Sequence, residues 1–251
     1  MSPPRVFVDL ALASGGEIAL PADVAAHVVR VLRLRAGEAL TLFDGRGGEY
    51  AGTLLEAGGR DRPPRVAVGA HAPVERESPL VLTLLQGVAR GERMDLIVQK
   101  ATELGAARLV PLATERGVVR LDEHGAGKRV AHWRAVAIAA CEQCGRNRLP
   151  RIDPVTPFER IADSVRGLAL AAGPRLLLDP LAQRPLAAAL SPGATAATLL
   201  VGPEGGLTHQ ELEQARIAGF EAVRLGPRVL RTETAPLAAL AVLQALAGDL
   251  G

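Results

Sequence analysis

The feature that most constrains the fold is a regular alternation of strand-like and helix-like segments over residues 80–251. Uncharged, mainly apolar runs such as Leu80–Gly87 and Thr198–Val201 are typical of strands that are buried on both faces. Segments with helical spacing separate them, among them Met94–Leu104 and Lys128–Cys144. The pattern predicts an α/β domain whose parallel sheet is covered by helices on both faces. Further strands are expected at Arg108–Pro111, Leu176–Leu178 and Ala222–Leu225, and further helices at Thr208–Ala218 and Glu233–Leu246.

The N-terminal region differs and is rich in β-type patterns. Ala39–Phe43 and Glu49–Glu56 flank a glycine-containing loop, which predicts a hairpin. Shorter strands are expected at Arg5–Asp9 and Arg65–Ala70, and a helix at Pro21–Val31. Two prolines and a run of charges follow at 73–79. We therefore expect a small domain over 1–72, a linker over 73–79 and a large domain over 80–251.

Composition excludes several classes of protein. Lysine and arginine number 29 against 27 acidic residues, so no global positive field attracts nucleic acid. Aromatic residues make up 2% of the chain, too few for a surface that stacks bases on rings. Cys141 and Cys144 end a helix and are expected to be packed thiols, without disulfide or metal. No signal peptide or membrane span is expected, and a reducing cytoplasm is the expected location.

The sharpest local signal lies at Leu199–Thr208, where a buried strand runs into Gly202-Pro203-Glu204-Gly205-Gly206. Glycines let backbone amides and carbonyls approach a ligand where a Cβ would intrude. Thr208 and Glu211 have the spacing of a capping box that begins the next helix. A tight turn that merely needs glycine is the alternative. Such a turn has no need of the proline and the carboxylate, so we favour a ligand site at this strand end.

Motifs that are missing narrow the class of ligand. The loop has neither the G-x-G-x-x-G spacing of dinucleotide sites nor the G-x-x-x-x-G-K-[ST] spacing of phosphate loops, and neither pattern occurs elsewhere. Gly125-Ala126-Gly127-Lys128 fails because Arg129 replaces the hydroxyl residue. A nucleoside-like ligand held by backbone groups is the interpretation that remains.

A second loop of the same layout follows the expected strand Ala222–Leu225. It runs from Gly226 to Arg231, and Thr232–Pro236 then begins the last helix with residues that suit a helix start. Capping accounts for the latter residues but not for Arg228 and Arg231. Two such loops, a helix apart, would face each other across one pocket.

Two polar clusters could be either functional sites or ordinary solvated surface. Glu142 and Arg146 stand at the end of a long helix, where an ordinary solvated helix end is an equal alternative. His27, Arg30 and Arg33 belong to a basic strip in the small domain. Alone, such a strip is more often a solvated face than a binding site.

Taken together, these segments resemble the RsmE family, the 16S ribosomal RNA uridine-N3 methyltransferases of the SPOUT superfamily. The matching segments, in the family's order, are Gln99–Gly105, Glu142–Arg146, Gly202–Gly206 and Leu225–Thr234. Arg5-Val6-Phe7 and His27–Arg35 resemble the family's N-terminal domain. The resemblance covers nearly the whole chain, and the ordered set is far more specific than any one piece.

The resemblance implies a C-terminal SPOUT methyltransferase domain with a parallel sheet and a deep trefoil knot, and a small N-terminal PUA-like β-barrel that helps to hold RNA. S-adenosylmethionine would bind in the knot, against the two glycine loops. The cofactor-binding residues would be Leu178, Leu200, Val201, Gly202, Pro203, Glu204, Gly205, Gly206, Leu225, Gly226, Val229, Leu230 and Thr234. The RNA-binding candidates are Arg5, His27, Arg30, Arg33 and Arg146.

It also implies a homodimer with its active site near the subunit interface. The substrate would be a uridine near the 3′ end of 16S rRNA, in the decoding region, within the assembled 30S subunit. No metal is needed, because the sulfonium of the cofactor is already activated. A near-neutral chain would then read folded RNA through a few placed arginines rather than through a broad basic field.

Uridine N3 is weakly acidic and must lose its proton before it attacks a methyl group. We therefore hypothesise that Arg231 stabilises the developing anion or clamps RNA, and that Glu142 or Glu233 takes the proton. One alternative, an α/β enzyme with a nucleotide cofactor such as an oxidoreductase, predicts a phosphate fingerprint that is absent. The others are a SPOUT-type methyltransferase acting on another RNA, and a non-catalytic RNA-binding protein, which leaves the two glycine loops unexplained.

Overall fold

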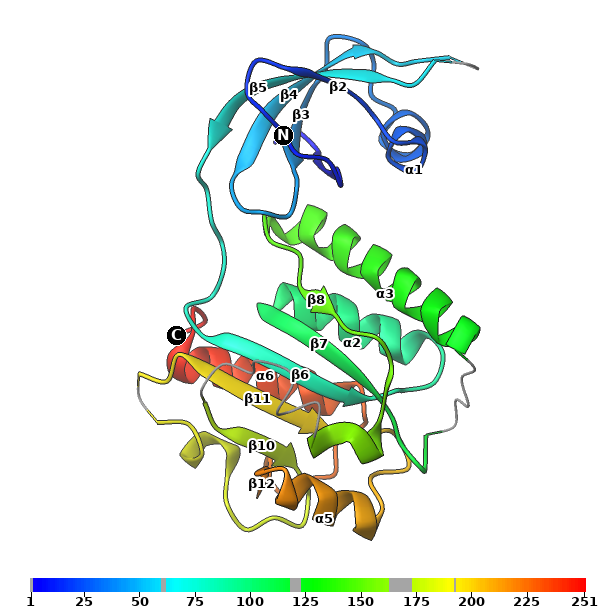
Figure 1. Ribbon diagram of the computed structural model, residues 1–251. Coiled ribbons are helices and arrows are strands. Elements are labelled where there is room, and N and C mark those ends of the chain that lie inside the picture. The colour runs from blue at the N-terminus through cyan, green and yellow to red at the C-terminus, as the bar shows by residue number, and fades with distance from the viewer. Residues whose placement is uncertain (1, 60–61, 118–122, 163–172, 192) are drawn as a thin grey trace. The chain divides into compact units, whose positions relative to one another are not determined.

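The computed structural model describes residues 2–59, 62–117, 123–162, 173–191 and 193–251 (Figure 1). The chain divides into two compact units. Unit 1 contains Met1–Glu77 and Cys141–Leu149, and unit 2 contains Ser78–Ala140 and Pro150–Gly251. Each unit has its own hydrophobic core.

The assignment of residues 141–149 to unit 1 differs from the sequence expectation, which placed them in a domain over 80–251. Polar side chains explain the difference. The Asn147 amide donates to the Val74 carbonyl over 2.6 Å, and the Arg146 guanidinium pairs with Glu77 over 2.6 Å. Arg146 and Asn147 are almost wholly buried. The segment therefore completes the interior of unit 1, where a solvated helix end was the alternative.

Unit 1 is built on a five-stranded sheet with the order β1-β3-β4-β5-β2. Its strands are β1 (Arg5–Phe7), β2 (Glu17–Ala19), β3 (Ala39–Phe43), β4 (Glu49–Glu56) and β5 (Arg65–Ala72). β1 runs parallel to β3, and the other neighbours are antiparallel. The hairpin of β3 and β4 is confirmed, with Leu42 opposite Tyr50.

The single helix expected over Pro21–Val31 consists of two pieces. α1 (Ala22–Ala26) is followed by the π-helical turn η1 (His27–Val31). Val28 of this turn is fully buried and belongs to the same core as Leu40 and Leu54 of the sheet. The helical segment thus covers the sheet of unit 1, and its polar residues face away from that core.

Unit 2 is built on a parallel sheet with the order β12-β10-β11-β6-β7-β8, and β9 also pairs with β7. Its strands are β6 (Val81–Gly87), β7 (Ala106–Ala113), β8 (Arg151–Ile152), β9 (Thr156–Pro157), β10 (Arg175–Leu178), β11 (Ala196–Val201) and β12 (Glu221–Val223). The expected parallel sheet is confirmed. The short strands β8 and β9 carry too few residues to show a pattern, and the sequence did not predict them.

Both faces of this sheet are covered, because successive side chains of a strand point to opposite sides. Leu199 and Val201 of β11 belong to one core, and Leu200 between them belongs to the other. The first core receives α2 (Glu92–Glu103), α3 (Glu123–Cys144), η3 (Leu186–Ala188) and α6 (Thr234–Ala247). The second core receives α5 (His209–Ile217) and η2 (Phe158–Arg160).

The arrangement places the chain's two glycine loops at one edge of the sheet. β10, β11 and β12 are parallel and adjacent, so their carboxyl ends lie together (Figure 1). The loops that leave β11 and β12 are those picked out from the sequence. The strand order alone does not test the deep trefoil knot, which stays a prediction.

Candidate functional site

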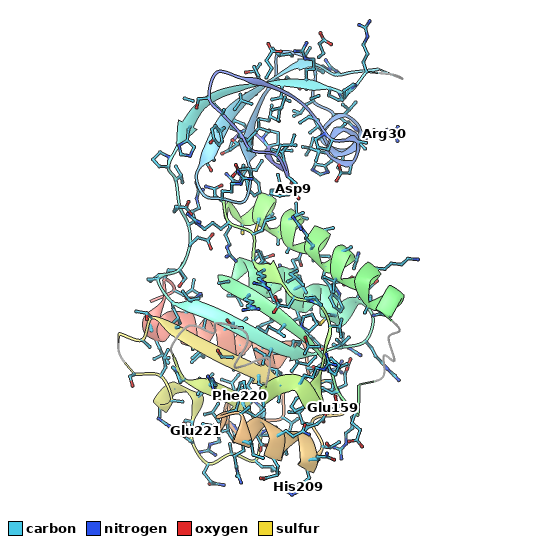
Figure 2. All side chains as sticks on the ribbon, in the orientation of Figure 1. Asp9, Arg30, Glu159, His209, Phe220 and Glu221 are labelled. Carbon is cyan, nitrogen blue, oxygen red and sulfur yellow. The ribbon has the colours of Figure 1, made fainter. Side chains whose placement is uncertain are left out.

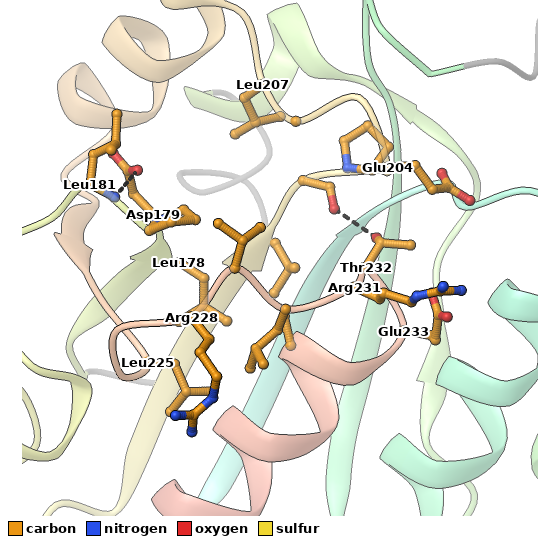
Figure 3. Close-up of a pocket in the computed structure, with 18 of the residues that line it drawn as sticks. Leu178, Asp179, Leu181, Glu204, Leu207, Leu225, Arg228, Arg231, Thr232 and Glu233 are labelled. Carbon is orange, nitrogen blue, oxygen red and sulfur yellow. Dashed lines mark hydrogen bonds between the residues drawn. The ribbon is translucent and has the colours of Figure 1, made fainter.

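A cavity of about 770 Å³ opens at this carboxyl edge of the sheet in unit 2 (Figure 3). Most of its lining falls within residues 178–181, 201–207 and 225–235, which follow β10, β11 and β12. The volume lies within the range of about 300–1,000 Å³ that is common for small-molecule sites. The cavity is thus a ligand-sized hollow built where parallel α/β sheets bind ligands.

Two glycines of the lining leave space that no protein atom fills. Gly206 has a φ of +68° and Gly226 a φ of +73°, in the left-handed region that side chains rarely adopt. A Cβ at either position would meet no protein atom within 4 Å. The backbone is therefore open to a ligand at both loops, which is the arrangement inferred from the glycine pattern.

The exit of the first loop is fixed by a capping box, as predicted. The Thr208 hydroxyl accepts a hydrogen bond from the Glu211 amide over 3.3 Å, and the Glu211 carboxylate accepts one from the Thr208 amide over 2.8 Å. The second oxygen of Glu211 accepts from the Glu115 amide over 2.8 Å. Three hydrogen bonds from backbone amides therefore fix the start of α5. They also hold the end of the loop in place, which limits how far the loop can move.

A partly buried polar contact joins the two glycine loops. The Thr232 hydroxyl donates to the Gly202 carbonyl over 3.0 Å (Figure 3). The amide of Gln86, which is fully buried at the end of β6, donates to the Gly87 carbonyl over 2.9 Å and to the Gly202 carbonyl over 3.4 Å. Gly202 is therefore held from β6 and from the second loop together, which fixes the distance between the two sides of the cavity.

A second link between the loops is ionic and lies in the cavity lining. The Arg93 guanidinium of α2 pairs with Glu204 over 3.0 Å and with Glu233 over 3.6 Å. Burial acts to raise the pKa of the Glu204 carboxyl, but the Arg90 amide and the Arg93 guanidinium outweigh it and hold that pKa below its ordinary value. Glu204 is therefore ionised at neutral pH, and Arg93 bridges the carboxylates of both loops.

The second loop also carries exposed residues, two of which are arginines that make no ion pair within the described residues. Arg228, Val229 and Arg231 are all exposed and all line the cavity. Figure 3 shows the side chains of Arg228 and Arg231 leaving the loop in different directions. Within the described part of the chain, neither guanidinium makes an ion pair. Their positive charge is uncompensated, in contrast to that of Arg93.

The structure brings most of the expected cofactor residues to the cavity. Those that line it are Leu178, Val201, Gly202, Pro203, Glu204, Gly206, Leu225, Gly226, Val229 and Leu230. Leu200, Gly205 and Thr234 do not. Leu200 points into the opposite core, the Gly205 carbonyl accepts from Arg116, and the Thr234 amide donates to the Arg231 carbonyl. Direct contact of any of these residues with a cofactor stays a prediction.

The lining also contains residues that the sequence did not single out. Asp179 and Leu181 follow β10, so the rule that ligands bind at carboxyl strand ends could have found them. Arg93 gave no local signal, because its role depends on partners more than a hundred residues away along the chain. Of the proposed catalytic residues, Arg231 and Glu233 line the cavity.

Glu142, the third catalytic candidate, belongs to unit 1. Its carboxylate accepts a hydrogen bond from the Phe7 amide over 3.0 Å and lies 3.9 Å from His27 Nε2. Burial raises the pKa of the Glu142 carboxyl, and the Phe7 amide and His27 only partly offset it. A carboxyl with a raised pKa is a better proton acceptor than an ordinary one, which suits the hypothesis without testing it.

The RNA-binding candidates fall into two groups. Arg5 pairs with Glu49 and donates to Asn147, and Arg146 is 3% exposed and pairs with Glu77, so both hold unit 1 together. Arg30 and Arg33 are exposed, and Arg30 lies on the outer side of its helical turn (Figure 2). Arg33 has a φ of +56°, a conformation unusual for a residue with a side chain.

Other expected features can be compared with the described residues. Cys141 is buried, and burial raises the pKa of its thiol to about 12, as suits a packed thiol. Over the described ranges, no three histidine, cysteine, aspartate or glutamate side chains gather in a way that would hold a metal ion. No helix in those ranges is long and apolar enough to cross a bilayer.

Comparison with known proteins gives these features a context. A family model described as an RNA methyltransferase domain matches residues 76–244, and one described as an RNA methyltransferase PUA domain matches residues 20–62. Fold, cavity and family models together define an RNA methyltransferase with an N-terminal PUA domain.

Individual relatives narrow this class. The crystal structure of a ribosomal RNA small subunit methyltransferase E from Neisseria gonorrhoeae, bound to S-adenosyl methionine, is 38% identical and covers 100% of both chains with a TM-score of 0.90. A putative methyltransferase from Legionella pneumophila, solved with the same cofactor, is 36% identical over 100% of both chains with a TM-score of 0.88. A ribosomal RNA small subunit methyltransferase E from Mycobacterium bovis is 34% identical over 96% of this chain and 90% of its own. The chain belongs to this family, which confirms the resemblance drawn from its sequence.

Proposed function

We propose that this protein transfers a methyl group from S-adenosylmethionine to N3 of a uridine in 16S rRNA, in the decoding region of the small ribosomal subunit. The observation that carries the proposal is the cavity of about 770 Å³ between the two glycine loops. The cofactor bound to the Neisseria and Legionella relatives supports it, as does the name of the former.

The lining fits an adenosine-containing cofactor. Leu178, Val201 and Leu225 offer apolar contact for a flat ring, and Gly206 and Gly226 leave backbone groups open beside it. The other expected residues of the two loops that line the cavity would complete the site; they are Gly202, Pro203, Glu204, Val229 and Leu230. When bound, S-adenosylmethionine supplies an electrophilic methyl group on a positively charged sulfur.

Methyl transfer to uridine needs two further things from the protein. The N3–H proton must leave, and the negative charge that develops on the uracil oxygens must be stabilised before N3 forms its bond to carbon. Arg231 is exposed, uncompensated and in the lining, so it suits the anion-stabilising role. Glu233 is in the lining and Glu142 has a raised pKa, so each remains a candidate proton acceptor.

We infer the remaining partners from the family. The substrate is 16S rRNA within the assembled 30S subunit, the protein acts as a cytoplasmic homodimer, and no metal takes part. Unit 1 helps to hold RNA through Arg30, Arg33 and His27. It contains the expected domain 1–72 together with residues 141–149. The C-terminal domain carries the trefoil knot in which the cofactor binds.

Two measurements test the proposal. Calorimetry with S-adenosylmethionine should give saturable binding, and absence of binding would leave only the non-catalytic RNA-binding alternative. Mass spectrometry of 16S rRNA from a deletion strain should show loss of N3-methyluridine, restored by the wild-type gene. Cofactor binding together with an unchanged N3-methyluridine content would point instead to a SPOUT-type enzyme that modifies another RNA.

A further inference from the structure

Two aliphatic side chains of the cavity lining are strongly exposed, namely Leu181, which is 84% exposed, and Val229. Val229 belongs to the lining, yet 81% of it is exposed. An aliphatic side chain in this position gains free energy only when a partner covers it. Ile217 of α5 is also 81% exposed but lies outside the lining, so it provides an internal comparison.

The charge around Val229 indicates the chemistry of the partner. Arg228 precedes it and Arg231 follows two residues later, and neither makes an ion pair within the described ranges. The other arginine of the lining, Arg93, is neutralised by two carboxylates. The exposed edge of this loop is therefore the positively charged part of the site, and it complements an anionic partner.

The aromatic residues do not belong to the cavity lining. The rings of unit 2 are buried in its cores, and those of unit 1 belong to its β-strands; they are Trp133, Phe158 and Phe220, and Phe7, Phe43 and Tyr50. A nucleobase at the mouth of this cavity has no ring to stack on, so an aliphatic side chain must supply the apolar contact.

We propose that Arg228 and Val229 form a docking edge for single-stranded RNA beside the methylation site. Val229 packs against the face of a nucleobase next to the target nucleotide, and Arg228 neutralises a backbone phosphate. The identity of the target nucleotide rests on the proposed function, but the binding of RNA to this edge is measured separately. A second copy of this chain and the cofactor itself are the other possible occupants, and each gives a different outcome.

The test compares the full-length protein with three variants, Val229→Asn, Arg228→Gln and the control Ile217→Asn. The probe is a fluorescent single-stranded RNA with the sequence of the 3′ region of 16S rRNA, and its binding is followed by anisotropy with saturating S-adenosylmethionine. Loss of one aliphatic contact should weaken RNA binding by Val229→Asn about tenfold, and Ile217→Asn should bind like wild type. Arg228→Gln should lower the slope of log Kd against log salt by about 0.7, as expected for one phosphate contact to a single strand.

Two further measurements exclude the other occupants. Calorimetry should give Arg228→Gln the wild-type affinity for S-adenosylmethionine, because Arg228 is not among the expected cofactor-binding residues. Light scattering should give wild type and variant the same molecular mass. A weaker cofactor affinity of Arg228→Gln or a changed molecular mass of the variant would overturn the proposal. So would RNA binding by Val229→Asn as tight as that by Ile217→Asn, together with an unchanged salt slope for Arg228→Gln. If wild type binds the RNA but methylates no rRNA, the proposed function fails while the anisotropy still decides this inference.

Discussion

Replacement of Gly87 by alanine tests how rigidly the first glycine loop is seated. Gly87 ends β6, and a Cβ added there would lie 2.6 Å from both the nitrogen and Cδ of Pro203. Neither atom can rotate away, because one belongs to the backbone and the other to the proline ring. The loop that carries Gly202 and Glu204 must therefore move as a unit.

The expected cost follows from the size of this overlap. Forcing one methyl group into a well-packed site typically costs about 1–3 kcal/mol, and contact with rigid atoms places Gly87→Ala near the middle, at about 2 kcal/mol. Movement of Gly202 also disturbs its hydrogen bonds with Gln86 and Thr232. The affinity for S-adenosylmethionine should therefore fall together with the stability of unit 2.

Trp133 makes the assay specific to unit 2. It is the chain's one tryptophan, is 2% exposed and belongs to the core that also contains Leu84 and Val201. Urea unfolding followed by its fluorescence should give Gly87→Ala a lower free energy of unfolding than wild type. Gly127→Ala is the matched control: its Cβ would meet no atom within 4 Å on α3, so it should gain about 0.5–1 kcal/mol. Wild-type stability and cofactor affinity in Gly87→Ala would refute the reasoning.

Three further predictions concern unit 1. Because burial raises the pKa of the Glu142 carboxyl, the folded protein loses stability as the pH rises through that pKa. Calorimetry should therefore show that Glu142→Gln unfolds at a higher temperature than wild type at pH 7. The difference should vanish near pH 4. Cys141, with a thiol pKa of about 12, should resist alkylation at pH 8 in native protein while the half-buried Cys144 reacts, as peptide mass spectrometry would show; equal labelling would contradict the packing. Arg146→Met should lower the free energy of unfolding by about 3 kcal/mol, the lower end for a broken buried ion pair, because Glu77 keeps some exposure. Glu77→Gln in the same background should recover part of this loss, as measured by urea unfolding.

Local patterns predicted the elements of the fold well where each residue's surroundings are set by its own chain segment. β11 could be recognised because it is buried along its whole length, and the start of α5 because Thr208 and Glu211 form a capping box. The π-helical turn at His27–Val31 could not, because its residues have ordinary helical spacing. The return of residues 141–149 to unit 1 depends on partners such as Val74 and Glu77, far away in sequence.

In the candidate site, too, the residues set by local sequence could be predicted, and those that depend on distant partners could not. The glycine loops that line the cavity could be recognised from sequence, because a positive φ favours glycine, as at Gly206 and Gly226. Leu200 does not line the cavity, because strand alternation turns it to the other core. Arg93 was missed because two carboxylates on separate loops define its position, and no spacing along the chain records that meeting.

The route of the chain through unit 1 has a consequence for how the protein is made. Because Arg146 and Asn147 supply hydrogen bonds to Glu77, Val74 and Arg5, the N-terminal unit lacks part of its interior until residue 149 has been synthesised. During translation, β6, α2, β7 and α3 must leave the ribosome before unit 1 can close. A fragment cut after Glu77 would be an incomplete body, and the two units cannot be exchanged between proteins by a single fusion point.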